Sequence, residues 1–99
     1  MRPIKLTLEA KSDLKDLLKY TQKVWGEQQR KIYKAHFDHA FALLSEFPAG
    51  GQRRDELFIG CRCKLVEQHV IFYRLEENAV EVVRILHSRM DIQSRLRDY

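Results

Sequence analysis

The hydrophobic period of this 99-residue chain changes once, at a predicted loop over 48–56 that begins Pro48-Ala49-Gly50-Gly51, and this change most constrains the fold. Before the loop, apolar residues recur at steps of three and four, which is the period of an α-helix that buries one side. After the loop, side chains alternate along extended runs, which is the period of β-strands. The sequence therefore predicts helices followed by a sheet, an α+β domain.

Two helices are expected before the loop. Thr7 is the predicted N-cap of the first helix, and Pro48 ends the second, which runs over 27–47. Because only Gly26 joins the helices, they should form an antiparallel hairpin, with Trp25 plugging its end. A short strand precedes them. The apolar stripes are Ala10, Leu14, Leu17, Thr21 and Val24 in the first helix and Tyr33, Phe37, Ala40, Leu44 and Phe47 in the second.

Three strands are expected after the loop, over 57–65, 69–75 and 79–87. The segments between them are short enough for hairpin turns, so the strands should form an antiparallel meander. The tail, 91–99, has only Ile92 and Leu96 as apolar anchors and is at best a short docked helix. We interpret residues 1–99 as a single domain.

The alternation of side chains predicts the two faces of the sheet. Strict alternation would place Val83, Ile85 and His87 on one face of the last strand. One face of the sheet should pack on the helices, while the other is apolar with arginines set into it. That second face is either a binding surface or is covered by the amino-terminal strand, a helix or the tail.

The charge of the chain favours an acidic partner. There are 18 Lys and Arg against 14 Asp and Glu, a net charge of +4, which suits nucleic acid or an acidic protein segment and does not decide between them. Lys11, Lys15, Lys19 and Lys23 form a row that we interpret mainly as a solvated face. The amino terminus lacks an apolar secretory core, and no uncharged run could cross a bilayer, so a cytoplasmic protein is expected.

The cysteines and histidines do not predict a metal site or a cofactor. Cys61 and Cys63 lie ~6.5 Å apart along an extended strand, too far for an undistorted disulfide. They could contribute to a zinc site with His69 or His87, although no second pair completes the ligands, and we favour two reduced, buried residues. His36 and His39 are spaced i, i+3 in the second helix and are interpreted as surface residues rather than ligands.

The chain resembles the ParE branch of the RelE/ParE superfamily of bacterial toxins. The resemblance covers almost the whole sequence and is most specific in its last part. It rests on Thr7, Ala10, Asp13-Leu14, Tyr20, Trp25-Gly26, Tyr33, Phe37, Phe47-Pro48, Gly60-Cys61-Arg62, His69-Val70-Ile71-Phe72-Tyr73-Arg74 and the run from Val83 through His87-Ser88-Arg89-Met90 to Asp91.

This resemblance implies a RelE/ParE-like fold and the toxin of a type II toxin-antitoxin system, neutralised by a cognate antitoxin. ParE-like relatives inhibit DNA gyrase, whereas RelE-like relatives cut messenger RNA on the ribosome. Val70 falls where RelE-like nucleases carry an arginine, so we favour a gyrase inhibitor that acts by binding, without catalytic residues. The alternatives are a ribosome-dependent endoribonuclease and a member that has lost its toxicity.

Two contact surfaces are predicted. An acidic amphipathic segment of the antitoxin should lie along Phe58, Arg62, Phe72, Arg74 and Arg84. The target should be contacted by His87, Arg89, Arg95 and Arg97. Structural roles are open for some of these residues: Arg84 could pair with Asp91 or a tail carboxylate, and His87 could bond the backbone.

Overall fold

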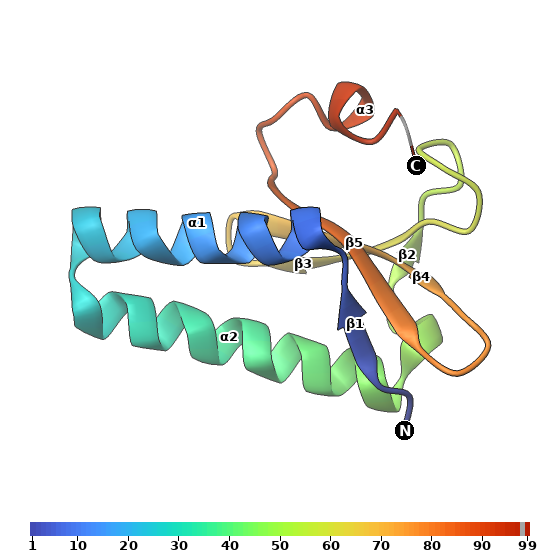
Figure 1. Ribbon diagram of the computed structural model, residues 1–99, viewed down its shortest axis with the longest axis horizontal. Helices are drawn as coiled ribbons and strands as arrows, with labels where there is room; N and C mark the ends of the chain where they lie inside the picture. Colours follow the sequence, from blue (N-terminus) through green and yellow to red (C-terminus); the bar gives the residue numbers. More distant parts are fainter. Residues whose placement is uncertain (98) are drawn as a thin grey trace.

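The protein is an α+β domain in which two long helices precede a mixed sheet (Figure 1). The structure, a computed structural model, describes residues 1–97 and 99; residue 98 of the predicted tail lies outside the described residues. Its elements are β1 (Ile4–Leu6), α1 (Leu8–Trp25), α2 (Glu27–Glu46), the 3-10 helix η1 (Pro48–Gly50), β2 (Gln52–Arg53), β3 (Arg62–Val66), β4 (His69–Leu75), β5 (Val80–His87) and α3 (Ile92–Arg95). The sheet order is β1-β5-β4-β3-β2, with β1 parallel to β5 and the other pairs antiparallel.

The helix hairpin forms where the sequence predicts it. The Thr7 side chain accepts a hydrogen bond from the Ala10 backbone N–H at 3.0 Å and so caps α1. Gly26 joins the helices at φ 96°, a conformation that favours glycine. The prediction for Trp25 is wrong, because this side chain is 71% exposed. The physical reason is visible in Figure 1, where the Gly26 end of the hairpin projects past the sheet and has nothing to plug.

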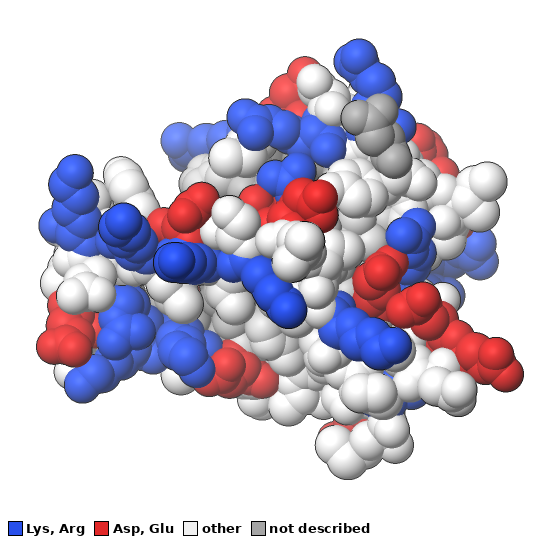
Figure 2. All heavy atoms as spheres, viewed as in Figure 1, with Lys and Arg blue, Asp and Glu red and all other residues white. Residues whose placement is uncertain are grey.

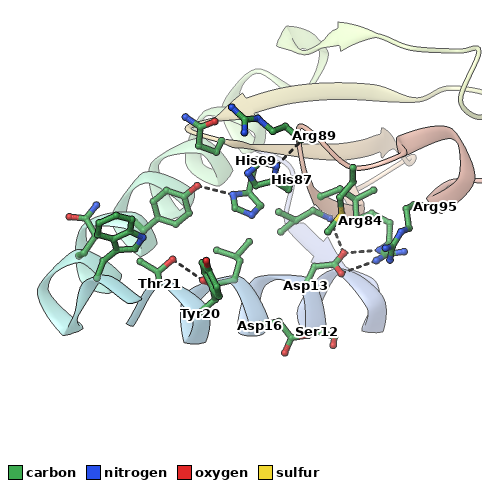
Figure 3. A pocket seen from close by; sticks show the side chains of 18 residues that line it. Ser12, Asp13, Asp16, Tyr20, Thr21, His69, Arg84, His87, Arg89 and Arg95 are labelled. Atoms are coloured by element: carbon green, nitrogen blue, oxygen red, sulfur yellow. Dashed lines mark hydrogen bonds and ion pairs between the residues drawn. The ribbon is translucent and has the colours of Figure 1, made fainter. Parts of the chain in front are cut away.

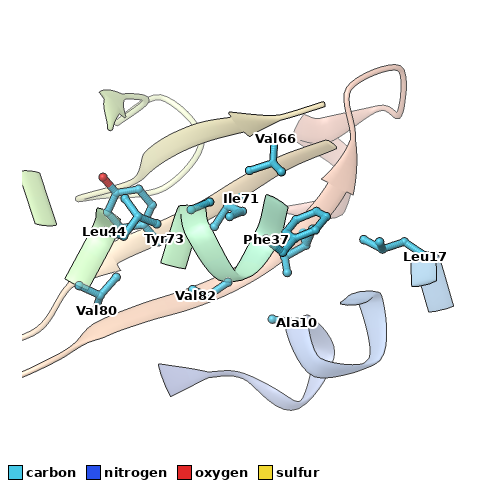
Figure 4. Close-up of a cluster of buried hydrophobic side chains, with 11 residues drawn as sticks. Ala10, Leu17, Phe37, Leu44, Val66, Ile71, Tyr73, Val80 and Val82 are labelled. Atoms are coloured by element: carbon cyan, nitrogen blue, oxygen red, sulfur yellow. The ribbon is translucent and has the colours of Figure 1, made fainter. Parts of the chain in front are cut away.

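The helices cover one face of the sheet and form the larger core with it (Figure 4). Phe37 and Leu44 of α2 pack there with Ile71 and Tyr73 of β4. Tyr73 also has its polar atom satisfied: its hydroxyl donates to the Pro48 carbonyl at 2.9 Å and accepts from the Gly51 N–H at 2.8 Å. The remaining buried members of this helix-side core are Ala10, Leu17, Ala40, Val66, Val80, Val82 and Ile85.

The other face of the sheet is covered by the tail and by the loop before β3. Phe72 of β4 is buried there beneath Leu96 of the tail and Phe58 of the loop. We call this cluster the tail-side core; its other buried members are Cys61, Val83 and Leu86. Of the two possibilities that the sequence left open for this face, the structure shows the covered one.

Two predictions about the strands are wrong. The strand expected over 57–65 begins only at Arg62, because Gly60 at φ 81° and a turn bond from the Cys61 N–H to the Phe58 carbonyl interrupt the extended backbone. Ile59, which should have shared a face with Cys61, is 93% exposed. The two-residue strand β2, which pairs with β3, lies in the segment predicted as loop.

A β-bulge changes the faces of β5. Phe72 pairs with Arg84 and Tyr73 pairs with Val82, so Val83 is an extra residue in β5. Val83 therefore packs in the tail-side core and Ile85 in the helix-side core, although strict alternation places them on one face.

Among the described residues, no helix is both long and apolar enough to span a bilayer.

Candidate interaction groove

An open groove of about 1030 Å³ lies between α1, the end of β5 and the tail (Figure 3). Small-molecule sites in proteins commonly have volumes of roughly 300–1,000 Å³, so this groove is at the large end of that range. Its walls carry Ser12, Asp13, Asp16, Leu17, Tyr20, Thr21, Trp25, Gln29, Tyr33, Gln68, His69, Arg84, Ile85, Leu86, His87, Arg89, Met90 and Arg95.

One end of the groove is fixed by Asp13, which ties α1 to β5. Arg84 donates to both carboxylate oxygens of Asp13, from Nε at 2.7 Å and from Nη2 at 2.9 Å, and the Ile85 N–H donates to the same carboxylate at 3.0 Å. The hydrogen bond to Asp13 raises the pKa of the Arg84 guanidinium, against the opposing effect of burial. Among the described residues, the ion-pair partner of Arg84 is thus Asp13 rather than Asp91.

The position of Asp13 follows from where β1 ends. The pairing of β1 with β5 stops at Leu6 and Val82, and past this point the edge of β5 is bonded by the start of α1. The Thr7 N–H donates to the Val82 carbonyl at 3.0 Å, and the Thr7 hydroxyl donates to the Val83 carbonyl at 2.7 Å. Asp13 continues this series six residues after Thr7, about 1.7 helical turns further along α1, so the helix replaces the missing neighbouring strand.

The floor of the groove holds two histidines. Their ring centroids lie 5.2 Å apart, with His69 on β4 and His87 at the end of β5. The Tyr33 hydroxyl is 2.7 Å from Nδ1 of His69. Burial, followed by the nearby His87, lowers the pKa of His69 to about 4, so His69 is neutral at pH 7.

Hydrogen bonds also indicate which ring nitrogens carry protons. The Arg89 backbone N–H donates to Nδ1 of His87 at 3.1 Å, so the proton of neutral His87 lies on Nε2. This is the backbone role that the sequence left open for His87. Burial raises the pKa of Tyr33, partly offset by a hydrogen bond from the Gln68 backbone. The Tyr33 hydroxyl either donates to Nδ1 of His69 or accepts from it, according to which ring nitrogen of His69 carries the proton.

The predicted target-contact residues mostly meet in this groove. His87, Arg89 and Arg95 line it, and Arg97 is exposed on the tail outside its lining. Figure 2 shows basic side chains along α1 and around the tail, and the lysine row of α1 is exposed, as predicted. Sequence reasoning missed Tyr20, Asp16 and Met90 as lining residues. The sequence did contain a signal for Tyr20. This aromatic residue lies off the apolar stripe of α1, so it was expected to face away from the core.

The predicted antitoxin-contact residues are not an open surface in this structure. Phe58 and Phe72 are buried in the tail-side core. Arg74 pairs with Glu81 at 2.7 Å, and its guanidinium lies 5.6 Å from the centre of the Phe58 ring. Arg62 donates to the Ala49 and Gly51 carbonyls at 3.2 and 3.3 Å, and Arg84 is held by Asp13. An antitoxin segment would reach the two phenylalanines only if the tail moved.

The cysteines and surface histidines have no ligand partners arranged around them. Cys61 is buried, and burial raises the pKa of its thiol to about 12, so it is not a thiolate at neutral pH. His36 is exposed with its Nε2 3.4 Å from Glu67, and His39 is exposed. Over residues 1–97 and 99, no group of three or more His, Cys, Asp or Glu is placed to hold a metal ion.

Comparisons with known proteins agree with this fold. The family described as the ParE toxin of the type II toxin-antitoxin system parDE matches residues 4–92. Toxin ParE1 of Caulobacter vibrioides is 33% identical over 96 residues, covering 97% of this chain and 99% of its own length. Toxin ParE of Escherichia coli is 38% identical over 95 residues, covering 94% of this chain and 91% of its own length.

Solved structures show the same fold at lower identity. The chromosomal ParDE toxin-antitoxin system of P. aeruginosa superposes with a TM-score of 0.75 at 18% identity, covering 88% of this chain and 96% of that one. A YafQ variant from E. coli superposes with a TM-score of 0.53 at 15% identity, covering 89% of this chain and 94% of that one. With the family match over residues 4–92, these findings show that the chain belongs to the ParE toxin family of type II toxin-antitoxin systems.

Proposed function

We propose that this toxin inhibits DNA gyrase in the cytoplasm by binding to it, without catalysing a reaction, through the groove beside α1 and the arginines of the tail. The observation that carries the proposal is the state of the polar groups around the groove. Arg84 is neutralised by Asp13, and His69 is engaged by Tyr33. A nuclease needs groups free to move protons and to hold a phosphate, and these two residues are already committed.

Exposed groups of the groove support a role in binding instead. Tyr20 and Trp25 are large aromatic side chains open to solvent, and Arg89 and Arg95 are exposed opposite them. Tyr, Trp and Arg are the residue types that most often dominate protein-protein interfaces. We therefore assign the predicted target contacts His87, Arg89, Arg95 and Arg97 to the gyrase interface.

The test compares two activities of one preparation. Purified toxin is added to a gyrase supercoiling assay and to a translation reaction scored for cleavage of messenger RNA. Inhibited supercoiling with intact messenger RNA is expected. The ribosome-dependent endoribonuclease is kept as the second candidate because His69 and His87 lie 5.2 Å apart between ring centres beside Arg89. Codon-dependent cuts with normal supercoiling would establish that second function and reject the first.

The partner that neutralises the toxin is an antitoxin, as in the family to which the chain belongs. For its contact surface we propose Phe58, Arg62, Phe72, Arg74 and Arg84, reached by an acidic amphipathic segment that displaces the tail. The tail-side core supports this, since α3 is a single four-residue turn and covers the face with few anchors. Amide exchange should show new protection over 57–87 in the complex; unchanged exchange there would reject the surface.

A further inference from the structure

The groove beside α1 combines aromatic surface with unneutralised positive charge. Trp25 is 71% exposed and Tyr20 is 64% exposed, and both lie on its α1 wall. Flat aromatic faces left open to water are suited to stacking against another planar ring. Such faces do not stabilise the fold of the free protein, because little of their apolar area is buried.

Other lining residues supply positive charge that no described residue neutralises in an ion pair. Arg89, in the turn after β5, and Arg95 of the tail line the groove and form no ion pair with any described residue. The other arginine of the groove, Arg84, is paired with Asp13. The charges of Arg84 and Asp13 cancel each other. The remaining charged lining residues are Arg89, Arg95 and Asp16, which leaves one net positive charge. The lining therefore favours an anion, and arginine binds phosphate oxygens especially well.

The floor between the two walls adds imidazole groups that can form hydrogen bonds. Nδ1 of His87 accepts from the Arg89 backbone N–H, which places a proton of His87 on Nε2, and Nδ1 of His69 lies 2.7 Å from the Tyr33 hydroxyl. Imidazole N–H groups bond phosphate or sugar oxygens. In Figure 3 both rings lie across from Tyr20, with Arg89 beyond them and Arg95 near Arg84 and Asp13. The groove therefore presents aromatic rings, imidazole groups and guanidinium groups to one open space.

We propose that this groove is a binding site for a nucleotide, whose base stacks on Tyr20 or Trp25 and whose phosphate is held by Arg89 and Arg95. Its volume of about 1030 Å³ suits a small molecule. A mixed polar and aromatic lining fits a ligand with one planar ring and one anionic group better than an amphipathic helix, which needs a continuous apolar surface. The site shares Arg89 and Arg95 with the proposed gyrase interface, so nucleotide binding is measured on the toxin alone, in the absence of gyrase.

Trp25 makes the site directly measurable, because the chain contains one tryptophan. Its fluorescence, excited at the long-wavelength side of its absorbance to avoid absorption by the base, should be quenched saturably by guanosine or adenosine 5′-monophosphate. The unphosphorylated nucleoside should bind at least tenfold more weakly, and inorganic phosphate should compete. A single-stranded oligonucleotide should bind no more tightly per site than the mononucleotide.

Two double variants with equal charge loss separate the site from general electrostatics. Arg89→Ala with Arg95→Ala should raise the nucleotide Kd at least tenfold, while Lys11→Ala with Lys15→Ala, outside the groove, should change it less than twofold. Tyr20→Ala should also weaken binding, and far-UV circular dichroism verifies that each variant is folded. Quenching that does not saturate, equal effects of the two double variants, or binding restricted to the oligonucleotide or to an acidic peptide would each overturn the proposal.

Discussion

The two faces of the sheet are buried by very different amounts of structure. The helix-side core lies under α1 and α2, helices of 18 and 20 residues. The tail-side core lies under a four-residue helix and the loop before β3. Both cores contain fully buried side chains, so burial of a residue does not distinguish them. What differs is how much of the chain must unfold to expose that residue, and this is small on the tail side.

The first prediction compares one large buried side chain from each core. Phe37→Ala should lower the free energy of unfolding by about 3–5 kcal/mol, because it leaves a cavity under both helices. Leu96→Ala should cost about 2 kcal/mol, the low end for a buried leucine, because the loss cannot exceed the free energy that holds the tail in place. Denaturant unfolding measures both.

Amide exchange shows whether the two cores are independent. Phe37→Ala should speed exchange throughout the domain, whereas Leu96→Ala should speed it only in the tail and in the residues it covers. Equal losses of stability and a global effect from Leu96→Ala would show that the two faces unfold as one unit, which would remove the basis for tail displacement.

The second prediction concerns Asp13, which lies between the two regions. Asp13→Asn leaves Arg84 without its ion-pair partner, and the two side chains are 14% and 16% exposed. Removing one member of a buried pair costs ~3–5 kcal/mol, and partial exposure should reduce this to about 2–3 kcal/mol. Thermal or denaturant unfolding provides the measurement.

Asp16 is the matched control for Asp13, since it lies on the same helix and is exposed. Asp16→Asn should change stability by less than about 0.5 kcal/mol. A double variant, Asp13→Asn with Arg84→Gln, should lose less than the sum of the two single changes. Additive losses would mean that the pair does not couple α1 to β5.

The third prediction is a loss of stability in mild acid caused by His69. Its folded pKa of about 4 is below the unfolded value of 6.5, so the unfolded chain binds more protons at intermediate pH. Stability is full above pH 6.5 and decreases as the pH falls from there towards 4. Because His69 is only half buried, we expect about 1 kcal/mol between pH 7 and pH 5.

Replacing the histidine separates this effect from other titrations. His69→Gln should be less stable at pH 7 and should lose less further stability on acidification. His39→Gln, which changes an exposed histidine, should keep the full pH dependence of the parent protein. Parallel pH profiles for the parent and the His69 variant would show that the burial of His69 does not contribute.

Sequence periodicity predicted the middle of each helix well because that part has a wide interface with one sheet face, but it was wrong for Val24 and Phe47, which end the two predicted stripes and are exposed. Phe37, Ala40 and Leu44 are buried at the expected spacing. The same reasoning failed where local backbone geometry overrides alternation. Gly60 at positive φ ends the extended run before β3, and the extra residue Val83 reverses the face assignment of the residues after it. A single sequence does not reveal a bulge, because its cause lies in the pairing of two strands.

The groove was predicted only in part, for a similar reason. The basic tail residues were found because charge is visible in the sequence, but Tyr20 and Asp16 were not, since their importance depends on the tail passing beside α1. The Asp13 partner of Arg84 is 71 positions away in the chain. No short-range pattern connects such residues. The resemblance to ParE toxins predicted the fold, whereas these long-range contacts are seen only in the folded structure.

The smallest effect on stability is expected from replacing Arg89 and Arg95. Arg89→Ala combined with Arg95→Ala should leave the melting temperature nearly unchanged, because both side chains are exposed and pair with no described residue. The same variant should weaken toxicity at least tenfold, which corresponds to about 1.4 kcal/mol of lost binding. Antitoxin affinity, measured by calorimetry, should change less, since that contact is proposed on the tail-side face of the sheet. Growth inhibition on induction measures the toxicity. Full toxicity in a folded double variant would show that Arg89 and Arg95 do not contact the target. The tail would then serve only to cover the sheet through the tail-side core.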